Sequence, residues 1–158
     1  RLKTCLFLYS DFVVLRFRYK KTGKDSNLKR PHIPITICGT NEKINVIALL
    51  DSGSDYCFIP REIAEYLKLQ LKGEEEVIST AGKTKLQTTT ILVEISGPGD
   101  HKIYGFLVPA HVPLDKTDGQ ILVVGRIGFF ENFVVTFDGA KKEIILKPHK
   151  ETQPQKIN

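Results

Sequence analysis

The sequence contains no Met and no Trp, only three Cys, and no run of about 20 apolar residues that could span a membrane. Its longest apolar stretch, residues 6–15, is interrupted by Ser10 and Asp11, and no targeting segment is evident. We therefore expect a cytoplasmic protein. Because the chain does not begin with Met, we expect that it was trimmed or cut from a longer one. The three Cys follow no C-x-x-C pattern, which indicates free thiols in a reducing compartment.

The four His lie in no metal-binding motif, so we expect no metal and no other cofactor. With 158 residues, 41% hydrophobic and 26% charged, the composition excludes collagen, coiled-coil and disordered classes. A chain of this length can bury roughly 70% of its unfolded surface in a single core. An enzyme with duplicated catalytic lobes usually needs about twice as many residues, so this chain can hold one such lobe.

The net charge of +5 is concentrated at one end of the chain. Residues 1–30 hold nine Lys or Arg against two acidic residues, whereas the remainder holds 14 against 16. A basic segment could contact nucleic acid or an anionic membrane, but no nucleic-acid recognition pattern accompanies this one. We favour a solvated face or an edge strand, where Lys discourages aggregation.

Short strand-like segments with turn residues between them predict an all-β fold, β-rich with one or two short helices, that forms a closed or half-closed barrel. The strands are expected at 12–19, 33–38, 43–50, 77–80, 86–95, 102–109, 120–124, 133–138 and 143–147. The helices are expected at 60–69 and 126–132. We divide the chain into a basic N-terminal strand and loop at 1–32, a main domain at 33–148 and a polar tail at 149–158.

The most informative stretch is an apolar strand, residues 45–50, that runs directly into Asp51-Ser52-Gly53. At the end of a buried strand a carboxylate would enter a low-dielectric environment that disfavours its charged form. A strand-ending turn is the alternative, because Asp, Ser and Gly all favour turns. The pattern Asp-[Ser/Thr]-Gly should occur by chance in on the order of one chain in ten or twenty of this size. The neighbouring segments must therefore decide between the two.

Those segments make the chain resemble the retropepsin-type aspartic proteases, the retroviral and retroviral-like family. Leu49–Asp55 matches the catalytic loop of that family, and Val123–Arg126 matches the later apolar-apolar-Gly-Arg element beside the loop. Between them, Val77–Ile91 stands where the family has its flap hairpin, with Ala81–Lys83 as the tip. The resemblance covers roughly 33–148, in the correct order, and implies an acid-protease barrel with one lobe per chain.

The resemblance also implies roles for single residues. Asp51 would be the catalytic carboxylate, and Ser52 would join the hydroxyl network that supports the catalytic loops. Gly53 would hydrogen-bond to the substrate through its backbone. Asp55 would contact the substrate main chain and form a structural pair with Arg126.

At the flap tip, Ala81 and Gly82 would contact the substrate. Three features depart from the retroviral relatives. The tip has few Gly and carries Lys83 and Lys85, Ser52 replaces the commoner Thr, and about 30 residues precede the matching region.

One Asp-[Ser/Thr]-Gly per chain implies two chains. Aspartic protease chemistry needs two carboxylates that share one proton, and the other Asp-Gly pairs, at 118–119 and 138–139, lie in turn-like settings. A two-fold homodimer supplies the second carboxylate, because a residue beside the axis meets its own copy. A polypeptide substrate would lie across the interface as an extended strand, with apolar side chains in alternating pockets.

Other chemistries fit less well. A phosphatase that uses an aspartyl-phosphate would need a second Asp where Gly53 stands, and no Gly-rich phosphate loop is present. A Ser or Cys nucleophile would need a His brought near by the fold. The main rival is a catalytically silent, protease-like module for dimerisation or peptide binding. We favour a peptidase because Asp51, Ser52, Gly53, Asp55 and Arg126 are all retained together.

Overall fold

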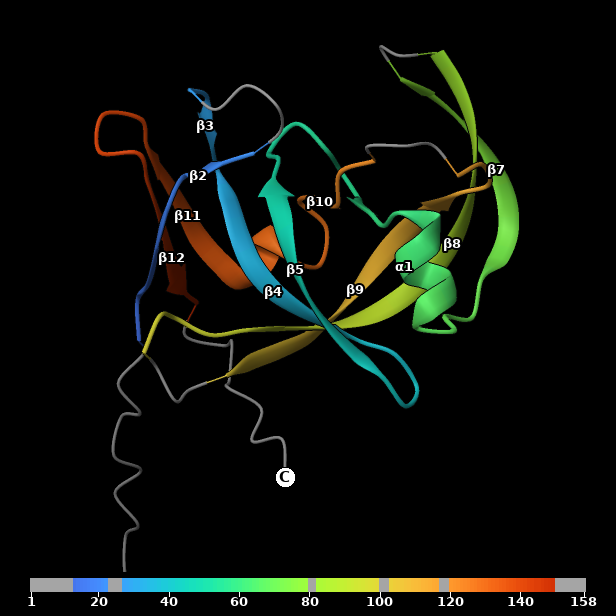
Figure 1. Ribbon diagram of the computed structural model, residues 1–158, viewed down its shortest axis with the longest axis horizontal. Coiled ribbons are helices and arrows are strands. Elements are labelled where there is room, and N and C mark those ends of the chain that lie inside the picture. The colour runs from blue at the N-terminus through green and yellow to red at the C-terminus, as the bar shows by residue number, and fades with distance from the viewer. Residues whose placement is uncertain (1–12, 23–26, 80–81, 100–102, 117–119, 150–158) are drawn as a thin grey trace, which may run out of the picture.

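The computed structural model describes residues 13–22, 27–79, 82–99, 103–116 and 120–149, and strands dominate it (Figure 1). The strands are β1 (Leu15–Arg18), β2 (Lys20–Lys21), β3 (Lys29–Arg30), β4 (His32–Cys38), β5 (Lys43–Leu50), β6 (Cys57–Phe58), β7 (Lys72–Ser79), β8 (Gly82–Ile95), β9 (Tyr104–Pro113), β10 (Val123–Val124), β11 (Phe133–Asp138) and β12 (Glu143–Pro148). The helices are α1 (Arg61–Tyr66) and the 3-10 turn η1 (Phe130–Asn132).

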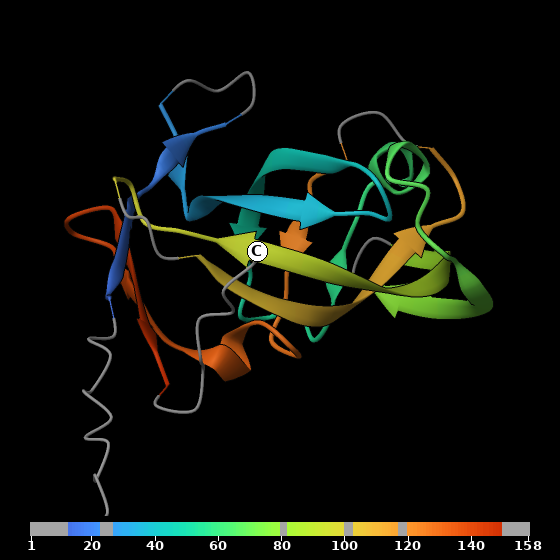
Figure 2. The ribbon, with the colours of Figure 1, turned by 90° about the horizontal axis from the view of Figure 1, so that it is seen from below.

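Six of these strands close into a barrel. They pair in the order β4-β5-β10-β6-β9-β8, and β8 pairs back onto β4, with Thr36 opposite Glu94. Figure 2 shows β4 and β5 lying over β8 and β9. Apolar side chains such as Ala48 and Leu50 of β5 are buried between these layers. The prediction of an all-β fold with a closed or half-closed barrel is confirmed, and the barrel is a closed one.

A second, three-stranded sheet has the order β1-β12-β11. In β1, Leu15 and Phe17 are buried in the same core as the barrel residues, whereas Arg16 and Arg18 are exposed. Arg16 forms an ion pair with Glu143 of β12, at 3.3 Å. The expected alternation of this strand is therefore confirmed, and the strand packs against the main body. The division at residue 32 stays a prediction.

Both predicted helices are shorter in the structure than the sequence indicated. We expected 60–69, but α1 ends at Tyr66 because Lys68 adopts a left-handed conformation with φ of +51°, which closes the last turn. At the other end, Pro60 is the N-cap residue and lies just before the first helical residue, Arg61. The second helix was expected at 126–132, but only η1 forms there, because Gly128 has φ of +81° and interrupts any regular helix before it.

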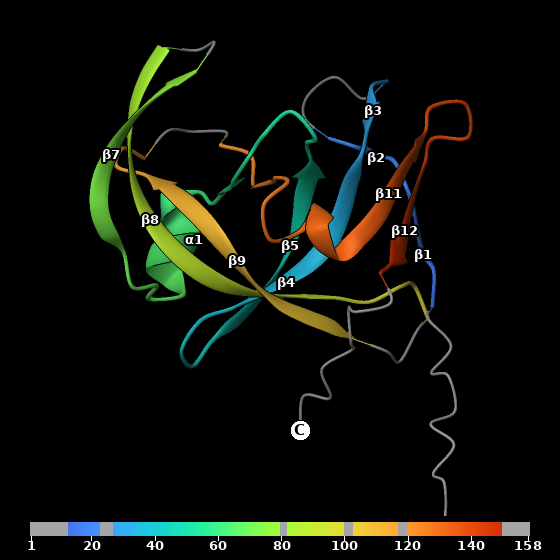
Figure 3. The same cartoon turned by 180° about the vertical axis from the view of Figure 1, so that it is seen from behind.

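The β7–β8 hairpin is longer than the sequence indicated. We expected its first strand at 77–80, but β7 begins at Lys72, because Lys72, Glu75 and Glu76 pair with β8 while their side chains stay exposed. An edge strand with exposed side chains needs no apolar alternation, so the sequence pattern did not mark it. Figures 1 and 3 show this hairpin projecting at the opposite end of the molecule from β11 and β12.

Other strand boundaries also differ from the prediction: β8 begins at Gly82 rather than 86, and β1 covers only Leu15–Arg18 of the expected 12–19. β9 extends to Pro113 rather than 109, because its last residues continue the ladder with β8. In contrast, β10 has only two residues instead of the five expected at 120–124. No helix among the residues described is both long and apolar enough to cross a membrane.

Candidate active site

Asp51 follows the last residue of β5, and its backbone is fixed by a segment far along the chain. The Asp51 N–H donates to the carbonyl of Val124 at 3.1 Å, and the Leu49 N–H donates to Leu122 at 2.9 Å. These bonds arise because β10 runs parallel to β5, with Val124 opposite Leu50. The two sequence motifs that carried the family resemblance are thus neighbours in space.

The loop after Asp51 is organised around that carboxylate. The Gly53 N–H donates to Asp51 Oδ1 at 2.9 Å, and the Ser54 N–H donates to the Asp51 carbonyl at 3.2 Å, which forms an Asx-type turn. Ser54 Oγ donates to the Tyr56 carbonyl at 2.8 Å. Asp51-Ser52-Gly53 can therefore be both a strand-ending turn and a catalytic loop, because the same turn orients the Asp51 side chain.

The environment of Asp51 is more open than we expected. The preceding Leu50 is buried, but the Asp51 side chain is only half-buried, and Ser52 and Gly53 are exposed. A single chain thus leaves this loop on its surface. The fully low-dielectric setting that we expected from a buried strand would require something further to cover the loop.

A second segment supports the loop from the other side. The Arg126 N–H donates to the Ser54 carbonyl at 2.9 Å, and the Ile127 N–H donates to the Asp55 carbonyl at 2.8 Å. The Arg126 guanidinium also forms an ion pair with the Asp55 carboxylate, so the structure brings together the two residues that we expected to pair. Both side chains are more than half exposed, and such pairs contribute about 0–1 kcal/mol. The backbone bonds therefore do most of the positioning.

Gly125 makes this close approach possible. A Cβ at this position would lie 2.6 Å from the Tyr56 carbonyl carbon and 2.9 Å from the Ser54 oxygen. Both neighbours are backbone atoms that cannot turn aside, so only Gly fits. The Gly of the late motif is thus required by the crossing of two chain segments.

A groove with a volume of about 630 Å³ lies between the β7–β8 hairpin and the barrel. Its lining residues from the hairpin and its base are Val77, Lys83, Thr84, Lys85 and Leu86. Those from the body are Phe58, Ile59, Pro60, Pro113, Leu114, Asp115, Gln120, Ile121 and Val123. The volume lies within the range of ligand sites, roughly 300–1,000 Å³. Of the residues expected at the flap tip, Gly82 is the first residue of β8, and Ala81 lies outside the described residues. Asp51 does not line the groove.

Sequence reasoning missed His111, which the fold places beside the motif. The His111 ring lies 4.5 Å from that of Tyr56 and 5.7 Å from that of Phe58, measured between centroids. Its Nε2 is 3.9 Å from a carboxylate oxygen of Glu75 on the hairpin. Burial lowers the pKa of His111, while Glu75 opposes that shift. The only signal in the sequence was a single polar residue within an apolar strand.

The structure also bears on the nucleophile alternatives. Burial raises the pKa of the Cys57 thiol, so this side chain is held in its unreactive neutral form. Among the described residues, no His hydrogen-bonds to Ser52 or Ser54. The same part of the chain contains no group of three or more His, Cys, Asp or Glu side chains arranged to hold a metal ion.

A six-stranded barrel that carries an Asp-Ser-Gly loop, supported by a Gly-Arg segment, is the arrangement of a retropepsin-type aspartic protease lobe. The family profile described as aspartyl protease matches residues 33–128, which is more than half of the chain. The chain therefore belongs to the aspartyl protease family. A comparison with curated proteins found no match.

A solved structure shows the same fold. The chain is similar to a retropepsin-like aspartic protease from Rickettsia conorii, with 21% sequence identity, a TM-score of 0.52, and coverage of 85% of this chain and 92% of that one. It is also similar to EIAV protease in complex with the inhibitor HBY-793, with 20% identity, a TM-score of 0.44, and coverage of 63% and 86%.

Proposed function

We propose that this protein is an aspartic endopeptidase that is active as a two-fold homodimer. The observation that carries the proposal is the Asp51 loop, in which one carboxylate is aimed by its own turn and held by the Gly125–Arg126 segment. The exposure of Ser52 and Gly53 supports it, because an exposed loop of this kind is available to meet its copy across a two-fold axis.

In the proposed dimer the two Asp51 carboxylates lie about 3 Å apart and share one proton, because both cannot remain ionised at that distance. The ionised carboxylate accepts a proton from a water molecule, which attacks the scissile carbonyl carbon. The protonated carboxylate donates a hydrogen bond to the carbonyl oxygen and polarises it. The shared proton therefore belongs to the pair of carboxylates and is not assigned to either residue alone. Ser52 supports the paired loops through its hydroxyl.

The proposed substrate is an extended polypeptide that lies in the groove beneath the β7–β8 hairpin, which acts as a flap. The carbonyl of Gly53, a residue whose N–H is already bonded to Asp51, and the residues Asp55 and Gly82 bind its main chain. The apolar groove residues Phe58, Ile59, Leu86, Leu114, Ile121 and Val123 support a preference for apolar side chains.

Incubation with a mixed peptide library at acidic and neutral pH tests the proposal. Wild-type protein should cleave peptides, Asp51→Asn should not, and Asp138→Asn should behave as wild type. Asp138 is a matched control because it caps the turn after β11, far from the loop, through bonds from the Ala140 and Lys141 N–H groups that an Asn oxygen also accepts. Absence of cleavage by the wild type at every pH would favour the silent peptide-binding module instead.

Subunit mixing tests the shared active site separately. If each dimer needs two Asp51 side chains, adding Asp51→Asn protein to wild type lowers activity through mixed dimers as subunits exchange. A wild-type protein that keeps its full activity in the mixture, or that sediments as a monomer at high concentration, would contradict the shared mechanism.

A further inference from the structure

One side chain, that of Arg61 at the start of α1, links two strands at the base of the β7–β8 hairpin. Its Nε donates to the Pro113 carbonyl at the end of β9, at 2.6 Å, and its Nη2 donates to Gln87 Oε1 on β8, also at 2.6 Å. Figures 1 and 3 show α1 lying beside β8 and β9. A single guanidinium thus joins three elements, and its rigid planar fork of donors fixes the geometry between them.

These contacts lie where the hairpin leaves the barrel. The ladder between β8 and β9 ends at Leu86 opposite Pro113, and the Leu114 N–H makes one further bond to the Lys85 carbonyl, at 3.0 Å. From Lys85 outward, β8 pairs only with β7 in the part of the chain that the structure describes. The contact between Arg61 and β8 is therefore made at the last fixed point before the projecting part of the hairpin.

The Pro113 carbonyl needs a hydrogen-bond donor that β8 does not supply. In a trans peptide group the C=O and the N–H point in opposite directions. The N–H of Leu114 points toward β8, so the carbonyl of Pro113, in the same peptide group, points away from it. Arg61 supplies the donor from that opposite side, which satisfies a backbone acceptor that the ladder leaves unpaired.

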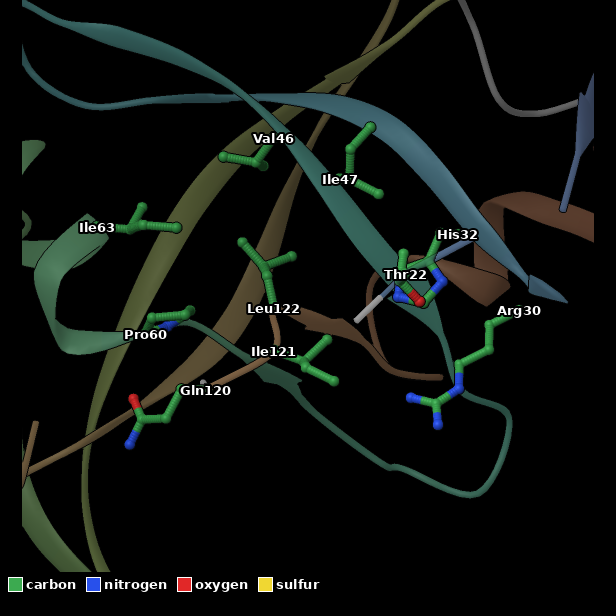
Figure 4. A pocket seen from close by; sticks show the side chains of 10 residues that line it. All are labelled: Thr22, Arg30, His32, Val46, Ile47, Pro60, Ile63, Gln120, Ile121 and Leu122. Carbon is green, nitrogen blue, oxygen red and sulfur yellow. The ribbon is translucent and has the colours of Figure 1, made fainter. Parts of the chain in front are cut away.

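The helix that carries Arg61 is packed against the body of the protein. Ala64 is only 1% exposed. Pro60 and Ile63 line a second cavity, of about 470 Å³, together with Val46 of β5 (Figure 4). Arg61 does not line this cavity, and its side chain reaches β8 and β9 instead. The guanidinium therefore acts from a support that is fixed on the barrel.

We propose that Arg61 is a positioning residue that sets the angle at which the β7–β8 hairpin stands over the groove. Pro60, Leu86 and Pro113 line the groove and belong to the three elements that the guanidinium joins. A movement of the hairpin about this point therefore changes the depth of the groove. Arg61 itself does not line the groove, so it acts on a bound peptide only through that wall.

The effect on peptide binding rests on the proposed function, whereas the link between Arg61 and the hairpin does not. Both partners of Arg61 belong to its own chain, so the link also needs no second copy. The hairpin and its cleavage activity are therefore measured separately below, with all variants at one protein concentration.

Amide hydrogen exchange tests the link without any need for peptidase activity. In Arg61→Leu, the backbone amides of residues 74–79 and 83–86 should exchange at least about tenfold faster than in the wild type, because a charge-assisted bond that restrains the hairpin is lost. The amides of Asp51 and Arg126, which are bonded within the Asp51 loop and its support, should change by less than about twofold.

Gln87→Glu provides a variant with the opposite effect. A carboxylate accepts a stronger, charge-assisted bond from the guanidinium, so exchange in the hairpin should slow by about threefold or more. In the Arg61→Leu background the same change should give no slowing, because the donor is gone. Arg16→Leu is the matched control, because Arg16 pairs with Glu143 in the second sheet. It should leave exchange in the hairpin unchanged.

Cleavage kinetics test the consequence for substrate binding. For a peptide that the wild type cleaves, Arg61→Leu should raise KM by about tenfold and leave kcat within about twofold. The reason is that the hairpin contributes to binding, whereas the Asp51 carboxylate is held by other hydrogen bonds. A fall in kcat with KM unchanged would contradict a role at the groove.

Three results of the exchange measurement would overturn the proposal: unchanged exchange of the hairpin in Arg61→Leu, an equal rise across the whole protein, or a slowing by Gln87→Glu that persists without Arg61. The second result would show that Arg61 supports only global stability. A protein that cleaves no peptide but shows the expected exchange would contradict the proposed function and leave the link intact, so the two failures are distinguishable.

Discussion

The Asp51 loop and the β7–β8 hairpin are held in different ways. The loop is bonded to residues 124–127, about 70 positions along the chain, and Gly125 lets the two segments touch. Beyond its base, the hairpin is held mainly by its own ladder, and Ile78 near the end is 74% exposed. Regions with few buried contacts open at low free energy.

This difference matches what each region would do in the proposed enzyme. A carboxylate must be placed to within a fraction of an ångström to activate water, so rigid support is useful. A cover over a peptide groove must open for substrate and product, so weak local stability is useful there. The following variants test whether the two regions differ in this way.

Gly125→Ala should have the largest effect. The added methyl group would collide with backbone atoms of Ser54 and Tyr56, so we expect the free energy of unfolding to fall by about 3 kcal/mol. Gly139→Ala is the control, because a Cβ there meets nothing within 4 Å. Urea denaturation measures both. A stable Gly125→Ala protein would mean that the loop is less tightly held than its hydrogen bonds indicate.

Leu86→Ala and Ile78→Ala compare the base of the hairpin with its outer part. Leu86 is only 2% exposed, so its truncation should cost about 2–3 kcal/mol. Ile78 is exposed, so the same change should stay within about 0.5 kcal/mol. Thermal or urea unfolding gives both values. A large cost at Ile78 would contradict the comparison and would mean that a second chain covers this end of the hairpin.

Two buried His should make stability pH-dependent. Burial lowers the pKa of His32 and His111, so below a pH of about 6.5 the unfolded chain binds these protons more readily than the folded one. Stability is unaffected above that pH and falls as the pH drops toward the folded-state pKa values. The slope reaches at most about 1.4 kcal/mol per pH unit for each His.

Each His also has a contact that opposes the effect of burial. A hydrogen bond with the Arg30 backbone raises the pKa of His32, and the charge of Glu75 raises that of His111. His32→Leu and His111→Leu should therefore each flatten the dependence of unfolding free energy on pH between about 6.5 and 5. Urea titrations at several pH values measure the slopes. Equal slopes in wild type and both variants would show that neither ring titrates differently on folding.

The smallest effects concern exposed ion pairs, for which we compare Asp55–Arg126 at the loop with Glu76–Lys83 on the hairpin. Double-mutant cycles should give coupling energies of about 0–1 kcal/mol for each pair, despite their different settings. For the loop pair, the charge swap Asp55→Arg with Arg126→Asp should recover part of the stability that either single reversal loses. A swap that is as unstable as the sum of the single changes would mean that the pair has no coupling.

The sequence predicted the barrel and the residues of the loop because both depend on local patterns. An apolar strand that ends in Asp-Ser-Gly, and a late apolar-Gly-Arg element, are visible in short windows. The sequence did not place His111 beside Tyr56, because that contact depends on how β6 pairs with β9. It also did not predict how open the Asp51 side chain is, since exposure depends on what surrounds the loop in space.

The boundaries that the sequence misplaced share a physical cause. The first strand of the hairpin was missed between 72 and 76 because exposed pairing leaves no apolar alternation to detect. The first helix was extended too far because the left-handed Lys68 that ends it is not a residue type that usually adopts this conformation. In both cases backbone geometry, rather than side-chain pattern, set the limit.

The short strand β10 has a consequence for how the protein is made. Asp51 leaves the ribosome early, but the carbonyl of Val124 that accepts its N–H, and the strand that closes the barrel between β5 and β6, follow some 70 residues later. Contacts so distant in sequence form late, because a long loop must close first. A nascent chain that ends before β10 therefore contains the whole Asp-Ser-Gly motif without the support that positions it. Synthesis order alone thus delays the assembly of a competent site until most of the domain has been translated.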